Sequence, residues 1–188
     1  MALPRLYLAG PEVFLPDAAA VGAAKVALCV RHGFEGLFPL DAALDLSGLA
    51  KPAQARRISD ANEGLMRSCA GLIANLTPFR GVSADSGTAF EVGFMRALGR
   101  PVFGYSNVLA DYVERSQTFR AERRAQPDAD AANVAIEDFD GAENLMIEQA
   151  IIASGGRIER AAAARGHEMR DLAGFEASLL QARRHFRL

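Results

Sequence analysis

The feature that most constrains the fold is the stretch of residues 71–100, which passes from a short apolar run through a polar loop into a helical pattern. The run 72–76 has the length and composition of a strand buried on both faces. Turn-forming residues fill the loop 77–85, and Gly99 with Pro101 ends the helical pattern. Such a unit brings backbone N–H groups and side chains to the carboxyl end of a parallel sheet, where these folds bind ligands. The stretch therefore predicts an α/β fold with a ligand site at this loop.

Short apolar runs recur along the chain and alternate with helical patterns. We predict strands at residues 5–9, 34–38, 72–76, 101–105 and 134–136, and helices at 17–30, from about 53 onward, 88–98, 108–118, 141–154, 158–164 and 172–184. Strands that alternate with helices favour a doubly wound α/β fold, and right-handed crossovers around a central first strand give a flavodoxin-like order. The predicted fold is a mostly parallel five-stranded sheet with helices on both faces.

The length of 188 residues predicts a single domain over 1–188, with a helical extension over about 155–188. Two segments, 39–52 and 120–133, carry no clear period and are predicted as loops. The first follows a strand, so it could cover a ligand or could be plain surface. The second is charged and rich in alanine, which is typical of an exposed excursion.

Composition argues against several classes of protein. The net charge is −2, so the basic footprint of a nucleic-acid-binding protein is missing. The two cysteines, Cys29 and Cys69, lie in apolar patterns without metal-ligand spacing, which indicates buried thiols in a reducing compartment. Neither a signal peptide nor a membrane span is apparent, so we expect a cytoplasmic protein with no membrane partner. A dinucleotide fingerprint and a P-loop are also missing, so we expect no cofactor and no metal.

The main candidate functional residue of the stretch 71–100 is Glu91, whose carboxylate lies between two apolar stripes of the predicted helix. Glu91 could close a capping box with Thr88, which alone would explain it. It could instead be a partly desolvated carboxylate that faces a ligand crevice together with Asp85, a pair suited to a nucleophile and a positioning group. The spacing does not choose between these two interpretations.

Three sequence motifs occur together in this chain: YLAGP at 7–11, NLTPFRG at 75–81 leading to EVG at 91–93, and ENLM at 143–146. Together they resemble the nucleoside 2-deoxyribosyltransferase family, and the similarity covers the chain up to about Ser154. The first motif is weak by itself, whereas the central run is specific, and its combination with the downstream NLM strengthens the assignment. The resemblance implies exchange of the base of a 2′-deoxynucleoside by double displacement, with net retention as in retaining glycosidases.

The resemblance assigns a role to each matched residue. It implies that Glu91 attacks C1′ and forms a deoxyribosyl-enzyme ester, and that Tyr7 orients this nucleophile. It further implies that Asp85 binds the sugar 5′-hydroxyl, and that Asn144, with Met146 beside it, reaches the 5′ end of the sugar in a neighbouring subunit's site. Glu91, Asp85, Tyr7 and Asn144 are thus the expected catalytic residues. From the residues alone, Asp85 and Asn144 could be ordinary helix-start residues, and Tyr7 a core aromatic.

The resemblance also implies a set of substrate-binding residues. Beside Met146, the set consists of Gly10, Pro11, Phe14, Asn62, Arg80, Gly81, Ser86 and Gly87. Gly10, Pro11 and Phe14 would edge the base. Asn62 departs from the family pattern, because well-known members carry an aspartate there that contacts or protonates the leaving base. An asparagine cannot deliver a proton, so another group protonates the base, or Asp60 or Glu63 takes that place through a shifted alignment.

The expected partners are 2′-deoxynucleosides and free purine or pyrimidine bases, with no nucleic acid. Because Asn144 would act in a neighbour's site, the resemblance implies a homo-oligomer, at least a dimer with a shared active site. The nearest alternative is a 2′-deoxynucleoside 5′-monophosphate N-glycosidase of the same superfamily, although Asp85 would repel a phosphate. A phosphoribohydrolase similar to the lysine-decarboxylase-like family and a non-catalytic nucleoside- or nucleotide-sensing module are further alternatives.

Overall fold

The computed structural model describes residues 2–39, 44–122 and 134–188 of the chain. Its centre is a five-stranded, fully parallel sheet in the order β2-β1-β3-β4-β5. The strands are β1 (Arg5–Ala9), β2 (Glu35–Leu37), β3 (Gly71–Asn75), β4 (Val102–Ser106) and β5 (Ile158–Arg160). The flavodoxin-like α/β prediction is therefore confirmed. In this order the chain reverses its winding direction between β1 and β3, and ligands of doubly wound folds bind at the carboxyl ends of such neighbours.

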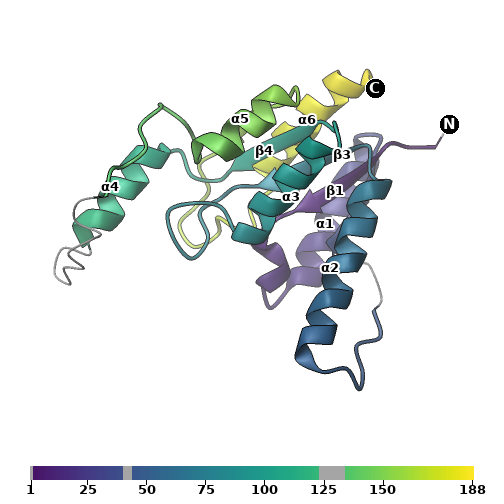
Figure 1. Cartoon of the computed structure of the whole chain (residues 1–188). Coiled ribbons are helices and arrows are strands. Elements are labelled where there is room, and N and C mark those ends of the chain that lie inside the picture. Colours follow the sequence, from purple (N-terminus) through teal and green to yellow (C-terminus); the bar gives the residue numbers. More distant parts are fainter. Residues whose placement is uncertain (1, 40–43, 123–133) are drawn as a thin grey trace.

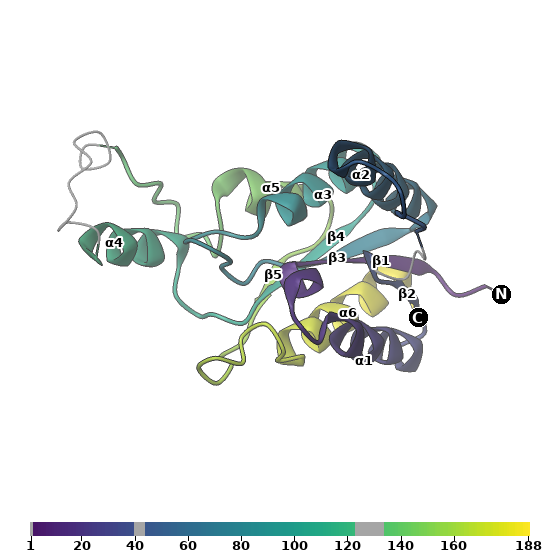
Figure 2. The ribbon, with the colours of Figure 1, turned by 90° about the horizontal axis from the view of Figure 1, so that it is seen from below.

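Helices cover both faces of the sheet, as Figure 2 shows. The helices are α1 (Ala18–Arg31), α2 (Lys51–Ser68), α3 (Ser86–Ala97), α4 (Tyr112–Glu122), α5 (Leu145–Ala153) and α6 (Ala173–Phe186), with a short 3₁₀ turn η1 (Pro11–Phe14) after β1. Helices α1 and α6 lie on one face, and α2, α3 and α5 lie on the other (Figure 2). Helix α4 projects from the body and has no buried residue (Figure 1).

Each face of the sheet has its own apolar core. On the α1 and α6 face the core includes Leu8, Leu28, Phe103, Phe175 and Leu179. On the other face, Tyr7, Met66, Ile151 and the α3 residues Val92 and Met95 pack together. Strands β3 and β4 are buried along their whole length, as their continuous apolar runs predict. No helix in the described segments is long and apolar enough to cross a membrane.

The fifth strand lies elsewhere than predicted. Residues 134–136 form no strand, and Val134 is largely exposed, whereas the stretch 158–164 that we predicted as helical contains β5. β5 is a short edge strand with the sequence IER, so it lacks the apolar run that marks the central strands. Its register with β4, in which Gly104 pairs with Ile158, identifies it.

Several helix boundaries also differ from the prediction. Helix α3 begins at Ser86, so Thr88 lies inside the helix and the proposed Thr88–Glu91 capping box is wrong. Helices α4 and α5 begin four residues later than expected, at Tyr112 and Leu145, because residues 108–111 and 141–144 belong to the loops before them. Cys29 and Cys69 are buried as predicted, although Cys69 lies just after α2. Residues 40–43 and 123–133 of the two predicted loops lie outside the described segments.

Candidate active site

The central pair of the site is Tyr7 on β1 and Glu91 on α3. The fully buried Tyr7 hydroxyl donates a hydrogen bond of 2.7 Å to Oε1 of Glu91. Burial raises the pKa of Glu91 to about 7; the hydrogen bond from Tyr7 opposes this shift and the charge of Asp85 adds to it. Burial and the Glu91 charge raise the pKa of Tyr7, so its proton stays on the hydroxyl. The pair thus joins a buried donor to a carboxyl group that changes charge near neutral pH.

The start of α3 shows why Glu91 takes this position. Asp85 is the N-cap residue, and its Oδ2 accepts hydrogen bonds from the backbone N–H groups of Gly87 (3.0 Å) and Thr88 (3.2 Å). Because Asp85 already caps the helix, the Glu91 carboxylate is not needed for that purpose. Of the two interpretations that the sequence left open, the desolvated carboxylate agrees with the structure, since Glu91 contacts a tyrosine on a distant strand.

A cavity of about 410 Å³ opens beside this pair, between α2 and α3. Its lining is Ala55, Ile58, Ser59, Asn62, Glu63, Met66, Gly87, Phe90 and Glu91. Three of the residues that the sequence assigned to the site, Asn62, Gly87 and Glu91, therefore border one space. That space combines apolar walls with a few polar groups, which is typical of a small-molecule site.

The predicted base-edging residues follow the carboxyl end of β1 and meet residues of the loop after β3. Gly10 and Pro11 are buried, whereas Phe14 is half-exposed and stacks on Phe79, with ring centroids 5.5 Å apart. The guanidinium of Arg80 lies over both rings, 4.9 Å from the centroid of Phe14 and 4.6 Å from that of Phe79. These residues do not border the cavity beside Glu91, so they form a second, aromatic part of the candidate site.

The remaining predicted residues are placed away from that cavity. Asn144 caps α5: its Oδ1 accepts from the N–H of Met146 (3.1 Å), and its Nδ2 donates to Glu137 (2.9 Å). Met146 is 72% exposed, which suits a contact with another molecule. Gly81 borders a separate groove against α4, and Ser86 is the exposed first residue of α3. Within one chain, Asn144 and Met146 are thus not brought to Glu91.

A buried polar cluster beneath Gly10 was missed by the sequence reasoning. The fully buried Glu12 pairs with Lys25 of α1, and its Oε1 also accepts from Nδ2 of Asn75 and from the Tyr105 hydroxyl, each at 2.9 Å. A Cβ on Gly10 would lie 2.0 Å from Oε2 of Glu12, so only glycine fits above this carboxylate. A signal was present, because Lys25 sits on the same helix stripe as Val21 and Leu28, which face the core.

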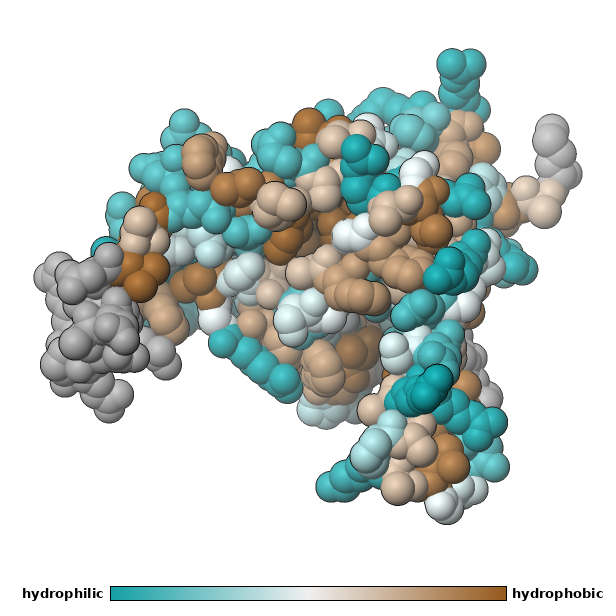
Figure 3. All heavy atoms as spheres, in the orientation of Figure 1, coloured by the Kyte–Doolittle hydropathy of each residue, from teal (hydrophilic) through white to brown (hydrophobic). Residues whose placement is uncertain are grey.

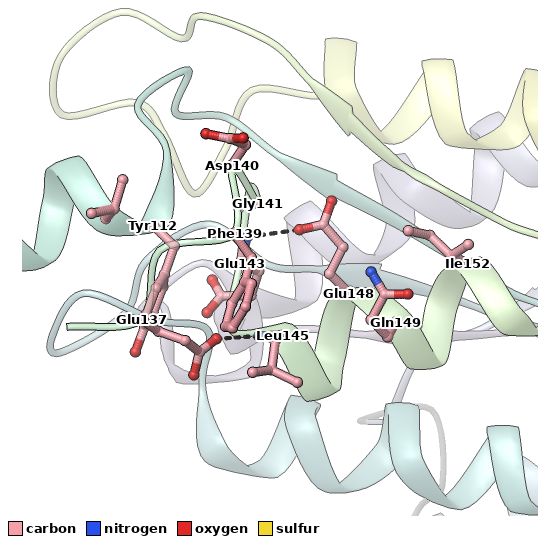
Figure 4. Close-up of a pocket in the computed structure, with 11 residues that line it drawn as sticks. Tyr112, Glu137, Phe139, Asp140, Gly141, Glu143, Leu145, Glu148, Gln149 and Ile152 are labelled. Atoms are coloured by element: carbon pink, nitrogen blue, oxygen red, sulfur yellow. Dashed lines mark hydrogen bonds between the residues drawn. The ribbon is translucent and has the colours of Figure 1, made fainter. Parts of the chain in front are cut away.

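A second missed pair, Glu143 and Arg115, holds the loop that leads into α3. Glu143 is 2% exposed, and burial raises the pKa of its carboxyl group. It bonds to Arg115 of α4 at 3.2 Å and lines a cavity of about 240 Å³ at the start of α5, drawn in Figure 4. The same view shows Glu137 and Glu148 bonded to backbone N–H groups around that helix start. In the described residues, no group of three or more His, Cys, Asp or Glu side chains is placed to hold a metal ion.

Comparison with known proteins shows the family and the fold of the chain. A sequence profile of the family described as nucleoside 2-deoxyribosyltransferase matches residues 6–146. A 2-desoxiribosyltransferase from Leishmania mexicana is 30% identical, with a TM-score of 0.60 over 77% of this chain and 85% of that one. An uncharacterized protein of Schizosaccharomyces pombe is 32% identical over 82% of this chain and 80% of its own length. A conserved protein from Enterococcus faecalis, 18% identical, shares the fold with a TM-score of 0.54 over 96% of this chain and 99% of that one.

The parallel sheet, with a partly buried carboxyl group beside a cavity, defines an α/β protein with a pocket of the kind that binds small molecules. Within that class, the matched profile covers three quarters of the chain. The chain belongs to the nucleoside 2-deoxyribosyltransferase family, whose chemistry takes place at the N-glycosidic bond of nucleosides.

Proposed function

We propose that the protein is a nucleoside 2-deoxyribosyltransferase that works through a covalent intermediate on Glu91. A carboxylate oxygen of Glu91 attacks C1′ of a 2′-deoxynucleoside as the C1′–N bond breaks, and the base leaves with the bonding electrons. A nitrogen of a second base then attacks C1′, and the ester bond breaks to return the carboxylate. The observation that carries this proposal is the partly buried Glu91 beside a cavity, hydrogen-bonded to Tyr7.

The surroundings of Glu91 support transfer to a base over hydrolysis. Apolar side chains of Ile58, Met66 and Phe90 line the same cavity, and a bound base would complete the exclusion of water. Tyr7 donates to Oε1 and leaves Oε2 to attack, which suits a positioning role for the tyrosine. Asn62 borders the cavity and can hydrogen-bond a base but cannot protonate it, so the proton of the leaving base comes from another group.

The start of α3 supports a substrate with a free 5′-hydroxyl. Helix N-termini commonly bind phosphate through their free backbone N–H groups. Here the carboxylate of Asp85 accepts hydrogen bonds from the N–H groups of Gly87 and Thr88. These donors are therefore engaged, and a negative charge lies at the helix N-terminus where a phosphate would bind. A 5′-phosphate would meet repulsion there, whereas a hydroxyl could donate to Asp85. The proposed substrates are therefore 2′-deoxynucleosides together with free purine or pyrimidine bases.

The test is base exchange with 2′-deoxyinosine and adenine, followed by chromatography for 2′-deoxyadenosine and hypoxanthine. We expect exchange by the wild type and a loss of at least about 1,000-fold in Glu91→Gln, because no covalent ester can form. Glu114→Gln, an exposed carboxylate of α4, is the matched control and should retain the wild-type rate.

Other outcomes of the same assay would contradict the proposal in distinct ways. Release of hypoxanthine without 2′-deoxyadenosine would identify a hydrolase, and the assay is then repeated with the 5′-monophosphate. Tight nucleoside binding without either product would identify a sensing module. A Glu91→Gln variant with the full rate would remove Glu91 from the chemistry.

A further inference from the structure

The loop that delivers Asp85 to the site is held by side chains from outside it. The Ser83 hydroxyl donates to Oε1 of Glu143, and the Ala84 N–H donates to Oε2 of Glu143 at 3.2 Å. These two loop residues directly precede Asp85, the N-cap of α3. A single buried carboxylate just before α5 thus fixes the approach of the chain to the helix that carries Glu91.

Arg115 holds the same loop from a second direction. Its Nε donates to the backbone oxygen of Val82 at 2.8 Å, and its Nη1 donates to Ala110 at 2.6 Å. Its Nη2 donates to the backbone oxygen of Ala142 (3.0 Å) and to Oε2 of Glu143 (3.2 Å). The guanidinium therefore ties loop 82–84, the segment before α4 and the segment before α5 into one unit.

The contacts of this pair favour a positioning role over simple charge neutralisation. Apart from their mutual contact, three Arg115 bonds go to backbone oxygens, and Glu143 accepts from the backbone of Ala84 and from Ser83. The side chains of Arg115 and Glu143 are 9% and 1% exposed, so these bonds are shielded from competing water. An ion pair that only neutralised its two buried charges would not need these hydrogen bonds to the loop.

We propose that Glu143, held by Arg115, is a positioning residue that sets Asp85 against the 5′-hydroxyl of the bound sugar. This rests on the proposed function. Glu143 does not line the cavity beside Glu91 and acts through Ser83 and Ala84. Its contribution to the reaction is thus expressed only when the substrate has a 5′-hydroxyl for Asp85 to bind.

The test compares 2′-deoxyinosine with 2′,5′-dideoxyinosine, which lacks that hydroxyl. For Glu143→Gln we expect kcat/KM with 2′-deoxyinosine to fall about 100-fold, the typical effect of a displaced positioning group, and with 2′,5′-dideoxyinosine to fall less than about 3-fold. Ser83→Ala removes only one contact with Glu143 and should show the same selectivity with a smaller loss, about 5-fold. Glu35→Gln removes a half-exposed carboxylate on the edge strand β2, far from Glu143, and should leave both rates unchanged.

Equal losses with both substrates in Glu143→Gln and Ser83→Ala would overturn the proposal, because a purely structural role lowers both rates alike. Amide hydrogen exchange gives a readout that needs no activity: the N–H groups of Ala84, Gly87 and Thr88 should lose protection at least about 10-fold in Ser83→Ala. Unchanged protection there would also refute the positioning role. A wild type that does not exchange bases would instead count against the proposed function. Amide hydrogen exchange would then still test whether Glu143 holds the loop before Asp85.

Discussion

At the scale of single residues, the environment of Glu91 decides what its carboxyl group can do. An exposed glutamate is fully ionised at neutral pH, and water competes for its oxygens. Glu91 of α3 is partly buried against β1, so burial raises the pKa of its carboxyl group while the Tyr7 hydroxyl favours the charged form. These opposed effects give a nucleophile that is weakly solvated yet available as a carboxylate at moderately alkaline pH.

This balance predicts the pH dependence of exchange. Because only the carboxylate attacks, kcat/KM should rise about tenfold per pH unit below a pKa of about 7 and level off above it. Tyr7→Phe removes the hydrogen bond that lowers the pKa of Glu91, so its rising limb should move to higher pH. At about pH 6 the variant should lose about tenfold more activity, relative to wild type, than at about pH 8.5.

The measurement is a profile of kcat/KM from about pH 5.5 to 9, using a substrate whose base does not ionise in that range. Unfolding by urea at both ends of the range serves as the control for stability. A profile of Tyr7→Phe that is parallel to the wild type would mean that the hydrogen bond has no influence on the charge of Glu91.

The sequence revealed this pair only in part. The motifs around Tyr7 and Glu91 pointed to both residues, and their resemblance to a family implied that they meet. The contact itself spans β1 and α3, and no spacing within the chain encodes it. The capping interpretation of Glu91 was wrong, because Asp85 rather than Thr88 is the N-cap and the Thr88–Glu91 spacing lies inside the helix.

At the scale of elements, buried polar clusters align the ends of the strands. Glu12 of η1 accepts hydrogen bonds from Asn75 at the end of β3 and from Tyr105 of β4, and it pairs with Lys25 of α1. Asn75 then accepts from the N–H of Thr77 at 3.0 Å. The Glu12 carboxylate therefore joins η1 and α1 to the carboxyl-terminal parts of β3 and β4, at the edge of the sheet where the site lies.

We predict that removing one charge of the Glu12–Lys25 pair destabilises the fold much more than removing both charges. Glu12→Gln leaves the Lys25 ammonium buried without its counter-charge and should lower the free energy of unfolding by about 3–5 kcal/mol. The double variant Glu12→Gln, Lys25→Met removes both charges and should recover most of that loss, because the glutamine oxygen can still accept from Asn75 and Tyr105.

Urea denaturation measures both free energies of unfolding. The matched control is Glu35→Gln, which breaks the Arg5–Glu35 pair at the edge of the same sheet. Both side chains of that pair are about half exposed, so the loss should stay below about 1 kcal/mol. A double variant as unstable as Glu12→Gln would show that the hydrogen bonds, rather than the unpaired charge, dominate.

The elements found from sequence are those whose burial leaves a strong pattern. β1, β3 and β4 are continuous apolar runs, and α1 and α6 each have an apolar stripe. These patterns allowed the α/β class and the strand order to be predicted from the sequence. β5 was missed because this three-residue edge strand, IER, has a single apolar residue and no such run. Lys25 and Arg115 were missed because charged residues are usually exposed, and only the folded chain shows the carboxylates that pair with them.

At the scale of the whole molecule, one face carries apolar side chains that the single chain leaves exposed. Phe90 of α3 is 57% exposed, and Met146 and Ile152 of α5 are 72% and 49% exposed. Figure 3 views this face, where apolar surface lies over the region of α3 and α5. Clustered apolar surface beside a candidate site favours association with another protein surface, and a second copy of the chain is the occupant we propose.

This proposal predicts that active sites are shared between subunits. Asn144 and Met146 do not border the Glu91 cavity of their own chain, so Asn144 is proposed to act in the site of a neighbour. Glu91→Gln and Asn144→Ala should each be inactive alone. In a mixed dimer, one site combines the intact Glu91 of one chain with the intact Asn144 of the other, and random mixing should therefore restore about a quarter of the wild-type activity.

The two variants are mixed after dissociation in mild denaturant and refolded together, and exchange of 2′-deoxyinosine with adenine is measured. Each variant refolded alone is the control, and light scattering gives the mass of the assembly. Because Asn144 is the N-cap of α5, Asn144→Ser is refolded in parallel to separate capping from catalysis: its hydroxyl can accept from the Met146 N–H and adds no charge next to Glu137. Failure of the mixture to exceed the separate variants would show that each chain completes its own site, and that Asn144 serves only its helix.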